Sequence, residues 1–111
     1  MEFTTKIAIV VADDLAVWQK LNVVAFLTSG VTSATEGLIG APYEDASGVQ
    51  YSALCIQPVV VLKSTRAKLN TFLARAERRG VKTAVYIEDM FDTGHDEANR
   101  ETVKQYITEE L

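Results

Sequence analysis

The sequence predicts an α/β fold: a three-layer α/β/α sandwich around a small mixed, mostly parallel sheet. Short β-branched runs alternate with helical patterns along the chain, and a strand, a helix and a strand follow one another between residues 59 and 87. That spacing predicts a right-handed crossover and a parallel pair of strands. With 111 residues, of which 48% are hydrophobic, the chain has room for one core. We therefore expect a single domain over residues 1–111.

The first strand is expected at residues 6–12, a β-branched run of the length that suits a central strand. A helix follows over about residues 17–29, and Gly30 is expected to end it. Because this helix is apolar nearly all round, it should be buried on more than one side. Asp13 or Asp14 is expected to cap it by accepting hydrogen bonds from its first free N–H groups.

The middle of the chain is expected to be poor in regular structure. Residues 30–48 are punctuated by glycine and proline among threonine, serine and aspartate, which indicates turns. A strand is weakly indicated at residues 49–56. Pro58 then opens a second central strand at residues 59–62, at a first position where the missing N–H donor is tolerated.

The clearest helix follows this second central strand. Ser64 or Thr65 can serve as its N-cap, and Gly80 stands where a C-terminal glycine belongs. A third strand is predicted at residues 82–87, a polar loop at residues 88–95, and a last helix from Asp96 onward. One apolar stripe is formed at helical spacing by Leu69, Phe72, Leu73 and Ala76.

The net charge of −4 is unevenly distributed along the chain. Residues 1–62 hold 2 basic and 6 acidic residues, residues 63–82 hold 7 and 1, and residues 83–111 hold 2 and 8. Non-specific nucleic-acid binding rests on phosphate neutralisation, so the acidic balance argues against nucleic acid as a partner. The basic middle segment could engage phosphate, although a solvated helix face is the simpler interpretation.

Several classes of protein are excluded by the composition. No apolar run reaches the roughly 18–20 residues of a membrane span, and the N-terminus lacks the basic-then-apolar order of a signal peptide. We expect a cytoplasmic protein with no membrane partner. Cys55 is the one cysteine, which excludes an internal disulfide. No His-x-x-x-His or Cys-x-x-Cys spacing supports zinc, so neither a metal site nor a cofactor is predicted.

Polar residues gather where the first predicted strand ends and the helix after it begins, namely Asp13, Asp14, Gln19, Lys20 and Asn22. In an open α/β sheet, ligands sit in the crevice at the carboxyl ends of the strands. The loop after the third predicted strand should reach the same edge, and it combines several carboxylates with His95, the only histidine. Such a group could do acid–base work or hold a cation, whereas acidic loops are more commonly solvated turns.

Three of these polar or aromatic residues also have a purely structural interpretation. Asp14 can be an N-cap, and Trp18 can pack over a neighbouring element instead of stacking on a ligand. Asn22 must find partners for its amide, so it either braces the loop at residues 89–93 or meets a ligand, and we favour the brace.

Two motifs resemble known families. Asp14-Leu15 after a strand, and Asp89-Met-Phe-Asp-Thr93 after a strand–helix–strand unit, are similar to the type II peptidyl-tRNA hydrolases. The closer similarity is to the domain-of-unknown-function 2000 family. Its Asp-Leu-x-x-Trp-Gln-x-Leu-Asn pattern is present at residues 14–22, and its Met-Phe-x-Thr pattern at residues 90–93. The resemblance covers about residues 6–108 and implies a fold like that of the hydrolases.

The hydrolase activity carries over only in part. The hydrolases place an arginine two residues before the first aspartate, where this chain has Ala12. Their lysines near the helix start fall on Gln19 and Leu21, with Lys20 one residue out of register. One residue is about 100° of rotation on a helix, so Lys20 is not assured of facing the same cavity. The residues that match one for one are Asp14, Asp89 and Thr93.

Two functions therefore stay open, and whether the protein is an enzyme is undecided. One is a module that binds a small molecule or a protein in the cleft of Asp14, Asn22, Asp89 and Thr93. The other is a hydrolase-like enzyme in which Thr93 or a water attacks and Lys20 stabilises developing negative charge. The missing arginine favours the first. The candidate catalytic residues are Asp14, Lys20, Asp89 and Thr93, and the candidate binding residues are Trp18, Gln19, Asn22 and His95.

The sequence also indicates which partners to expect. The ligand is unidentified. A small sheet leaves an exposed edge or face, and a homodimer is one common way to cover it. We therefore expect an unknown ligand and a homodimer.

Overall fold

The computed structural model describes residues 6–107 and 110–111 and shows a mixed α/β architecture. Within these residues, two six-residue strands lie side by side in a parallel sheet, and two short strands form a separate antiparallel pair. The elements in chain order are β1 (Ile7–Ala12), α1 (Val17–Ala34), β2 (Tyr43–Glu44), β3 (Gln50–Tyr51), β4 (Val59–Ser64), α2 (Arg66–Arg78), a 3-10 turn (Glu88–Asp92) and α3 (Asp96–Val103).

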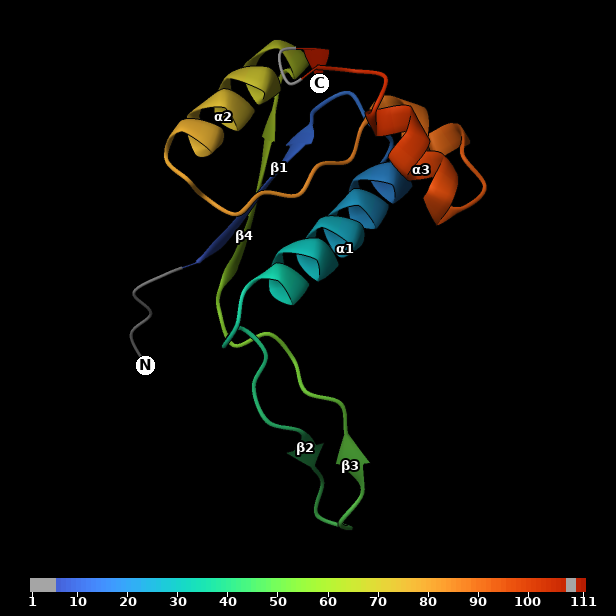
Figure 1. The fold of residues 1–111 in the computed structure, drawn as a ribbon. Helices are drawn as coiled ribbons and strands as arrows, with labels where there is room; N and C mark the ends of the chain where they lie inside the picture. Colours follow the sequence, from blue (N-terminus) through green and yellow to red (C-terminus); the bar gives the residue numbers. More distant parts are fainter. Residues whose placement is uncertain (1–5, 108–109) are drawn as a thin grey trace.

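The parallel sheet is formed by β1 and β4. Ile7 pairs with Val59 at one end and Ala12 with Ser64 at the other, so the two strands end together. Alternate residues of β1 point to the same face, which explains why Ile7, Ile9 and Val11 are buried together. Both α1 and α2 contact β1 (Figure 1). The two predicted central strands are thus confirmed, and they pair with each other.

The predicted third strand does not form. Residues 82–87 run in a non-repetitive path, and none of the backbone groups of residues 82–86 is hydrogen-bonded to another backbone group of the described chain. A strand exists only where a neighbouring strand completes its ladder. The sequence pattern was therefore not sufficient for a strand, because it did not provide a neighbouring strand for residues 82–87 to pair with.

Helix α1 begins and ends differently from the prediction. Its N-cap is Ala16, not Asp13 or Asp14, and the N–H of Ala16 donates to Oε1 of Gln19 at 3.0 Å. The helix also continues through Gly30 as far as Ala34. A Cβ on Gly30 would lie 3.1 Å from that of Ala84, so this glycine allows close packing of two segments instead of ending the helix.

The core is small and lies under α1. Its buried hydrophobic residues are Ile7, Ile9, Val11, Ala12 and Val23. In α1, Val23 alone is buried, whereas Leu21 and Phe26 are 66% and 53% exposed. The expectation that α1 is buried on several sides is wrong, because the sheet and residues 86–91 cover one side of it only.

Helix α2 agrees with the prediction. It starts after Thr65, and Gly80 follows its end with a φ of 67°, the left-handed conformation that glycine adopts without strain. Thr65 is the N-cap residue, although its side chain accepts no capping hydrogen bond. The last helix, α3, begins at Asp96 as expected. No helix in the described part of the chain has the length and apolar character needed to cross a membrane.

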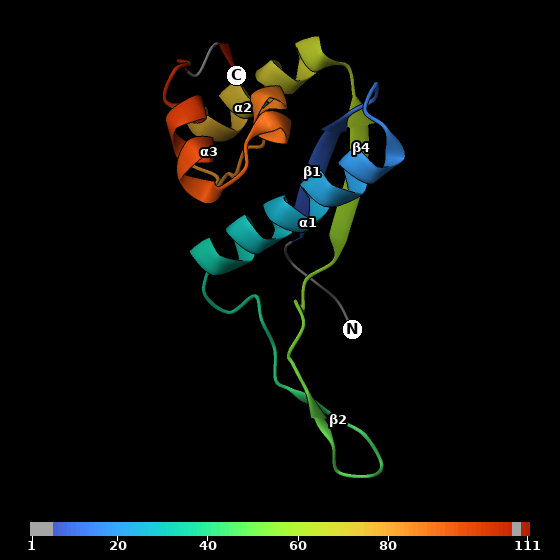
Figure 2. The same ribbon diagram turned by 90° about the vertical axis from the view of Figure 1, so that its right-hand side faces the viewer.

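Residues 38–56 form an extended arm that carries β2 and β3. In two views at right angles the arm points away from the helices and the parallel sheet (Figures 1 and 2). The radius of gyration of the molecule is therefore 16.1 Å, compared with about 13 Å for an ordinary domain of 100 residues. Of the weakly indicated strand at residues 49–56, Gln50 and Tyr51 are in β3, and Cys55 forms a single bridge with Ile39.

Candidate functional site at the carboxyl edge of the sheet

The parallel register brings two chain segments to one edge. Ala12 and Ser64 are paired at the carboxyl ends of β1 and β4, and the N–H of Asp13 donates to the carbonyl of Ser64 at 2.9 Å. Asp14 and Arg66, which come two residues after Ala12 and Ser64, therefore lie together at the carboxyl edge of the sheet. This is the position where an open α/β sheet normally holds its ligand.

A single guanidinium joins three segments at this edge. Nε of Arg66 donates to the two carboxylate oxygens of Asp14 at 3.1 and 2.9 Å. Nη2 of the same side chain lies 2.8 Å from Oε2 of Glu88, the first residue of the 3-10 turn. All three side chains remain about half exposed, at 48%, 58% and 57%. The group is thus ordered by ion pairs and open to solvent.

The charges in this group shift one another's protonation. The hydrogen bond from Arg66 lowers the pKa of Asp14 below its ordinary value, and the positive charge of Lys20 acts in the same direction. The hydrogen bonds to Asp14 and then to Glu88 raise the pKa of Arg66. Both groups are therefore charged across the neutral range. Beneath them, Oγ of Ser64 is buried without a hydrogen-bond partner in the described structure.

The start of α1 contributes one charged group and one capping group. Lys20 is partly buried and, as noted, its charge reaches Asp14. Gln19 is occupied by its hydrogen bond to Ala16. Asn22 is exposed, and its amide makes no hydrogen bond with the described residues. The interpretation of Asn22 as a brace for the loop at residues 89–93 is therefore wrong, because its side chain points to solvent.

Aromatic rings connect α1 to the segment that precedes the loop. Trp18 meets Phe91 edge to face, with ring centroids 6.1 Å apart, although Trp18 is still 63% exposed. Phe91 lies 5.0 Å from Tyr86, and Tyr86 lies 5.6 Å from Phe26 on α1. Such pairs hold a loop in place by burial and ring geometry. They give Trp18 a structural role and leave most of its surface open.

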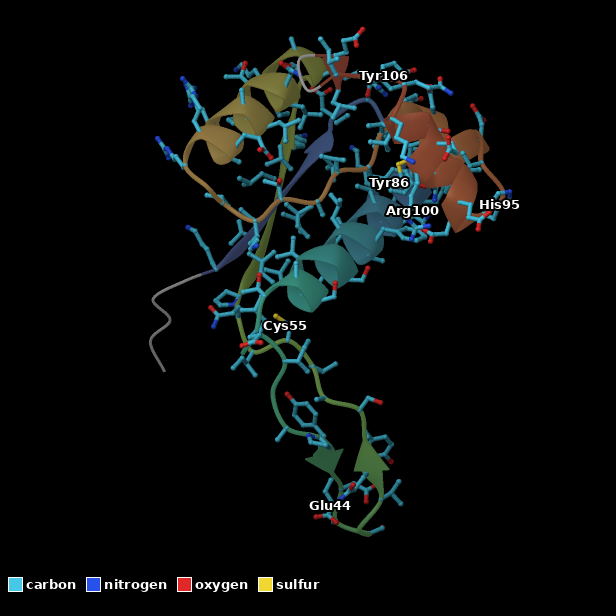
Figure 3. All side chains as sticks on the ribbon, viewed as in Figure 1. Glu44, Cys55, Tyr86, His95, Arg100 and Tyr106 are labelled. Atoms are coloured by element: carbon cyan, nitrogen blue, oxygen red, sulfur yellow. The ribbon has the colours of Figure 1, made fainter. Side chains whose placement is uncertain are left out.

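The remaining candidates form a second group around α3. Asp89 accepts a hydrogen bond from the hydroxyl of Tyr106, which raises the pKa of that tyrosine. The hydroxyl of Thr93 is bonded to the carbonyl of Met90 and to Oδ1 of Asn99. Nδ1 of His95 accepts the N–H of Ala98 at 3.1 Å. Figure 3 shows His95 on the outer side of α3, well apart from Tyr106.

The candidates therefore fall into two groups, and among the described residues no hydrogen bond or ion pair joins Asp14 to Asp89 or Thr93. One shallow hollow in the surface runs along α3 and is lined in part by His95, and another lies between the arginines at the end of α2. In the described part of the chain, no three histidine, cysteine or acidic side chains are arranged to hold a metal ion.

Comparison with known proteins adds the family. Residues 5–111 match the family model described as "Protein of unknown function (DUF2000)". The chain belongs to this family. A solved structure of a protein of unknown function from Agrobacterium tumefaciens is 48% identical to this DUF2000 chain, with a TM-score of 0.90. The match covers 96% of this chain and 79% of the other. No curated protein matches the chain.

The DUF2000 pattern at residues 14–22 thus led to the correct family, but not to all of the charged group. The sequence placed Arg66 only among the basic residues that could engage phosphate, for which a solvated helix face was the simpler interpretation. It did not single out Glu88, which completes the group around Asp14, or Asn99 and Tyr106, which bond to Thr93 and Asp89. One signal for Arg66 was available. It follows β4 as Asp14 follows β1, so the rule for strand ends applies to both.

Proposed function

We propose that this DUF2000 protein is a binding module that holds a small molecule with an acidic group at the carboxyl edge of β1 and β4. The observation that carries this proposal is the arginine shared by two carboxylates. Arg66 is fixed in one position by Asp14 and still has about half of its side chain exposed. A planar guanidinium in a fixed orientation is suited to a carboxylate or a phosphate, which it can bind through two parallel hydrogen bonds.

The three side chains suggest how a ligand would enter. Exposed ion pairs contribute little to stability, so an anionic ligand can displace Glu88 from Arg66 at small cost. Asp14 would keep the guanidinium in place while this happens. Lys20 would add a second positive charge from the start of α1, and the exposed face of Trp18 offers an apolar surface beside it.

A thermal-shift screen with inorganic phosphate, citrate and a set of small carboxylates and phosphate esters tests this proposal. The variant is Arg66→Met, and the control is Arg78→Met, at the other end of the same helix. We expect compounds that stabilise the wild type and the control and no longer stabilise Arg66→Met. Stabilisation that is equal in both variants, or no stabilising compound at all, would contradict the proposal.

A hydrolase-like enzyme is the alternative, and the hydrogen bonds of Thr93 weigh against it. An attacking hydroxyl needs a base that takes its proton. The hydroxyl of Thr93 is bonded to a backbone carbonyl and to the amide oxygen of Asn99, and neither is such a base. Asp89 is engaged by Tyr106. This arrangement favours binding over catalysis.

Peptidyl-tRNA is the substrate that separates the two functions. An acidic chain whose candidate loop carries Asp89 and Asp92 should attract a polyanion weakly at physiological salt. We therefore expect no efficient release of peptide from peptidyl-tRNA by the purified protein. Robust turnover by the wild type that is abolished in both Asp89→Ala and Thr93→Ala would restore the hydrolase. Turnover unaffected by either would indicate a contaminant.

We also propose that the fold is that of the type II peptidyl-tRNA hydrolases, a three-layer sandwich, and that the protein acts in the cytoplasm. The parallel pairing of β1 with β4 and the position of Asp14-Leu15 after β1 support the shared fold. A crystal structure superposed on a type II hydrolase tests it. Equivalent positions for Asp14 and Asp89 are expected, and a different order of the central strands would refute the relationship. Microscopy of a tagged protein tests the location.

A further inference from the structure

The arm at residues 38–56 is a ribbon with an exposed apolar surface. Ile39 pairs with Cys55, and Tyr43 pairs with Tyr51. The second pair lies four residues later on the first segment and four residues earlier on the second, so both pairs belong to one antiparallel register. Residues separated by an even number along such a ribbon share a face, which places Ile39, Tyr43 and Tyr51 together. These three side chains are 50%, 53% and 54% exposed. A soluble single chain rarely displays such a surface without a use for it.

The described part of the chain does not cover this surface of the arm. Figures 1 and 2 show it pointing away from the helices in both views. Its own turn is well formed, since Asp45 accepts the N–H groups of Ser47 and Val49 and Gly48 adopts a φ of 84°. The arm is therefore a defined structure that lacks a surface to lie on, and not an unformed loop.

The sheet displays a matching surface. β4 pairs with β1 along one edge, and its other edge has no strand beside it in the described structure. The face that Val59 and Val61 share is exposed as well, at 39% and 49%, and Leu62 on the opposite face is 53% exposed. An open edge with apolar neighbours is a template for another strand. Because residues 57 and 58 connect the arm directly to β4, the two surfaces are adjacent in the chain.

Charge and area both point to a second copy as the occupant. Residues 38–56 carry two acidic residues and no basic one, whereas residues 63–82 carry seven basic residues and one acidic residue. The arm of one copy is thus complementary in charge to the β4–α2 region of another. Nine large side chains of the arm and β4 are about half exposed, an area on the order of the 800 Å² that each partner buries in a standard interface.

We propose that two copies of this chain form a twofold homodimer in which each arm lies on the β4 region of the partner. The contact is isologous, because each copy supplies one arm and receives one. It covers the open edge of β4 and the apolar face of the arm in a single step. The proposal is independent of ligand binding at Arg66, so a failure of either one leaves the other standing.

The test is the mass of the full chain in solution, measured by sedimentation and light scattering at micromolar concentration. We expect twice the monomer mass of 12.2 kDa for the wild type. The arm variant is Ile39→Asp with Tyr43→Asp, whose side chains lie on the apolar face of the arm and are 50% and 53% exposed. The control is Leu21→Asp with Ile107→Asp, at 66% and 63%, outside both surfaces. The arm variant should dissociate about 100-fold more readily, and the control should stay dimeric.

A second variant tests the receiving surface. Val61→Thr keeps the β-branched shape that the strand needs and adds a polar group to the exposed face of β4, so it should weaken the dimer by about tenfold. Circular dichroism should show the same folded signal in every variant. A monomeric wild type, an arm variant as dimeric as the control, or a dimer insensitive to Val61→Thr would each overturn the proposal.

Discussion

The carboxyl edge of the sheet and the arm differ in what their side chains contact. At the edge, Arg66 connects Asp14 to Glu88, so three segments distant in the sequence hold one another. In the arm, the backbone is paired while Ile39, Tyr43 and Tyr51 stay half exposed. The edge is complete within one chain and is available to a ligand. The arm is complete only in its backbone, which is why we assign it to a partner.

The largest expected effect is on the free energy of unfolding when a large apolar side chain is shortened in the sheet or in the arm. Ile9 in β1 is 3% exposed, whereas Ile56 in the arm is 48% exposed. Ile9→Ala should lower the free energy of unfolding by about 2–5 kcal/mol, because it leaves a cavity in the small core. Ile56→Ala should change it by less than about 1 kcal/mol in a dilute, monomeric sample. Urea denaturation of both variants measures the two values, and equal losses would contradict the division into a packed sheet and an unpacked arm.

Substitutions of two glycines, one in the packed part of the molecule and one beside the arm, should lower stability for different reasons. A side chain at Gly30 meets Ala84, whereas Gly37, at the root of the arm, has open space and a φ of 81°. Gly30→Leu should destabilise by about 1–3 kcal/mol through overpacking, and Gly37→Leu by about 1–2 kcal/mol through backbone strain.

Asparagine distinguishes these two causes, because it tolerates the left-handed conformation and still occupies space. Gly37→Asn should therefore recover most of the stability lost in Gly37→Leu, and Gly30→Asn should not recover that lost in Gly30→Leu. Thermal denaturation of the four variants gives the comparison. Recovery at both positions, or at neither, would mean that the two glycines do not differ as described.

A tyrosine–aspartate hydrogen bond is present in the arm and another in the group around α3, and these two bonds should give the smallest effects. Tyr106 donates to Asp89, and Tyr51 donates to Asp45, and both bonds raise the pKa of the tyrosine above 10.0. A raised folded pKa means that the stabilisation is fully present below the unfolded pKa and is lost as the pH rises through the folded one.

Ultraviolet titration should therefore show two tyrosines that ionise late. Asp89→Asn should return Tyr106 toward its ordinary pKa and leave Tyr51 unchanged, and Asp45→Asn should do the reverse. Stability above pH 10.0 should depend less steeply on pH in each variant. A variant that shifts both tyrosines, or neither, would show that the two bonds are not independent local contacts.

Local patterns predicted the elements that local chemistry can specify. The short β-branched run at residues 6–12 predicted β1, and Gly80 marked the end of α2. The rule for strand ends also predicted that Asp14 lies at the carboxyl edge of the sheet. The same patterns failed at Gly30, whose ordinary role as a helix terminator was overridden by its contact with Ala84.

The sequence by itself determined the family, through the pattern at residues 14–22, and the order of β1, α1, β4, α2 and α3 along the chain. It could not determine which segments meet. Residues 82–87 have the composition of a strand but no ladder partner, and Arg66 looked like one of many solvated basic residues until Asp14 and Glu88 were seen beside it. Propensity acts over a few residues, whereas hydrogen-bond ladders, ion pairs and packing join residues far apart, so only the tertiary structure decided them.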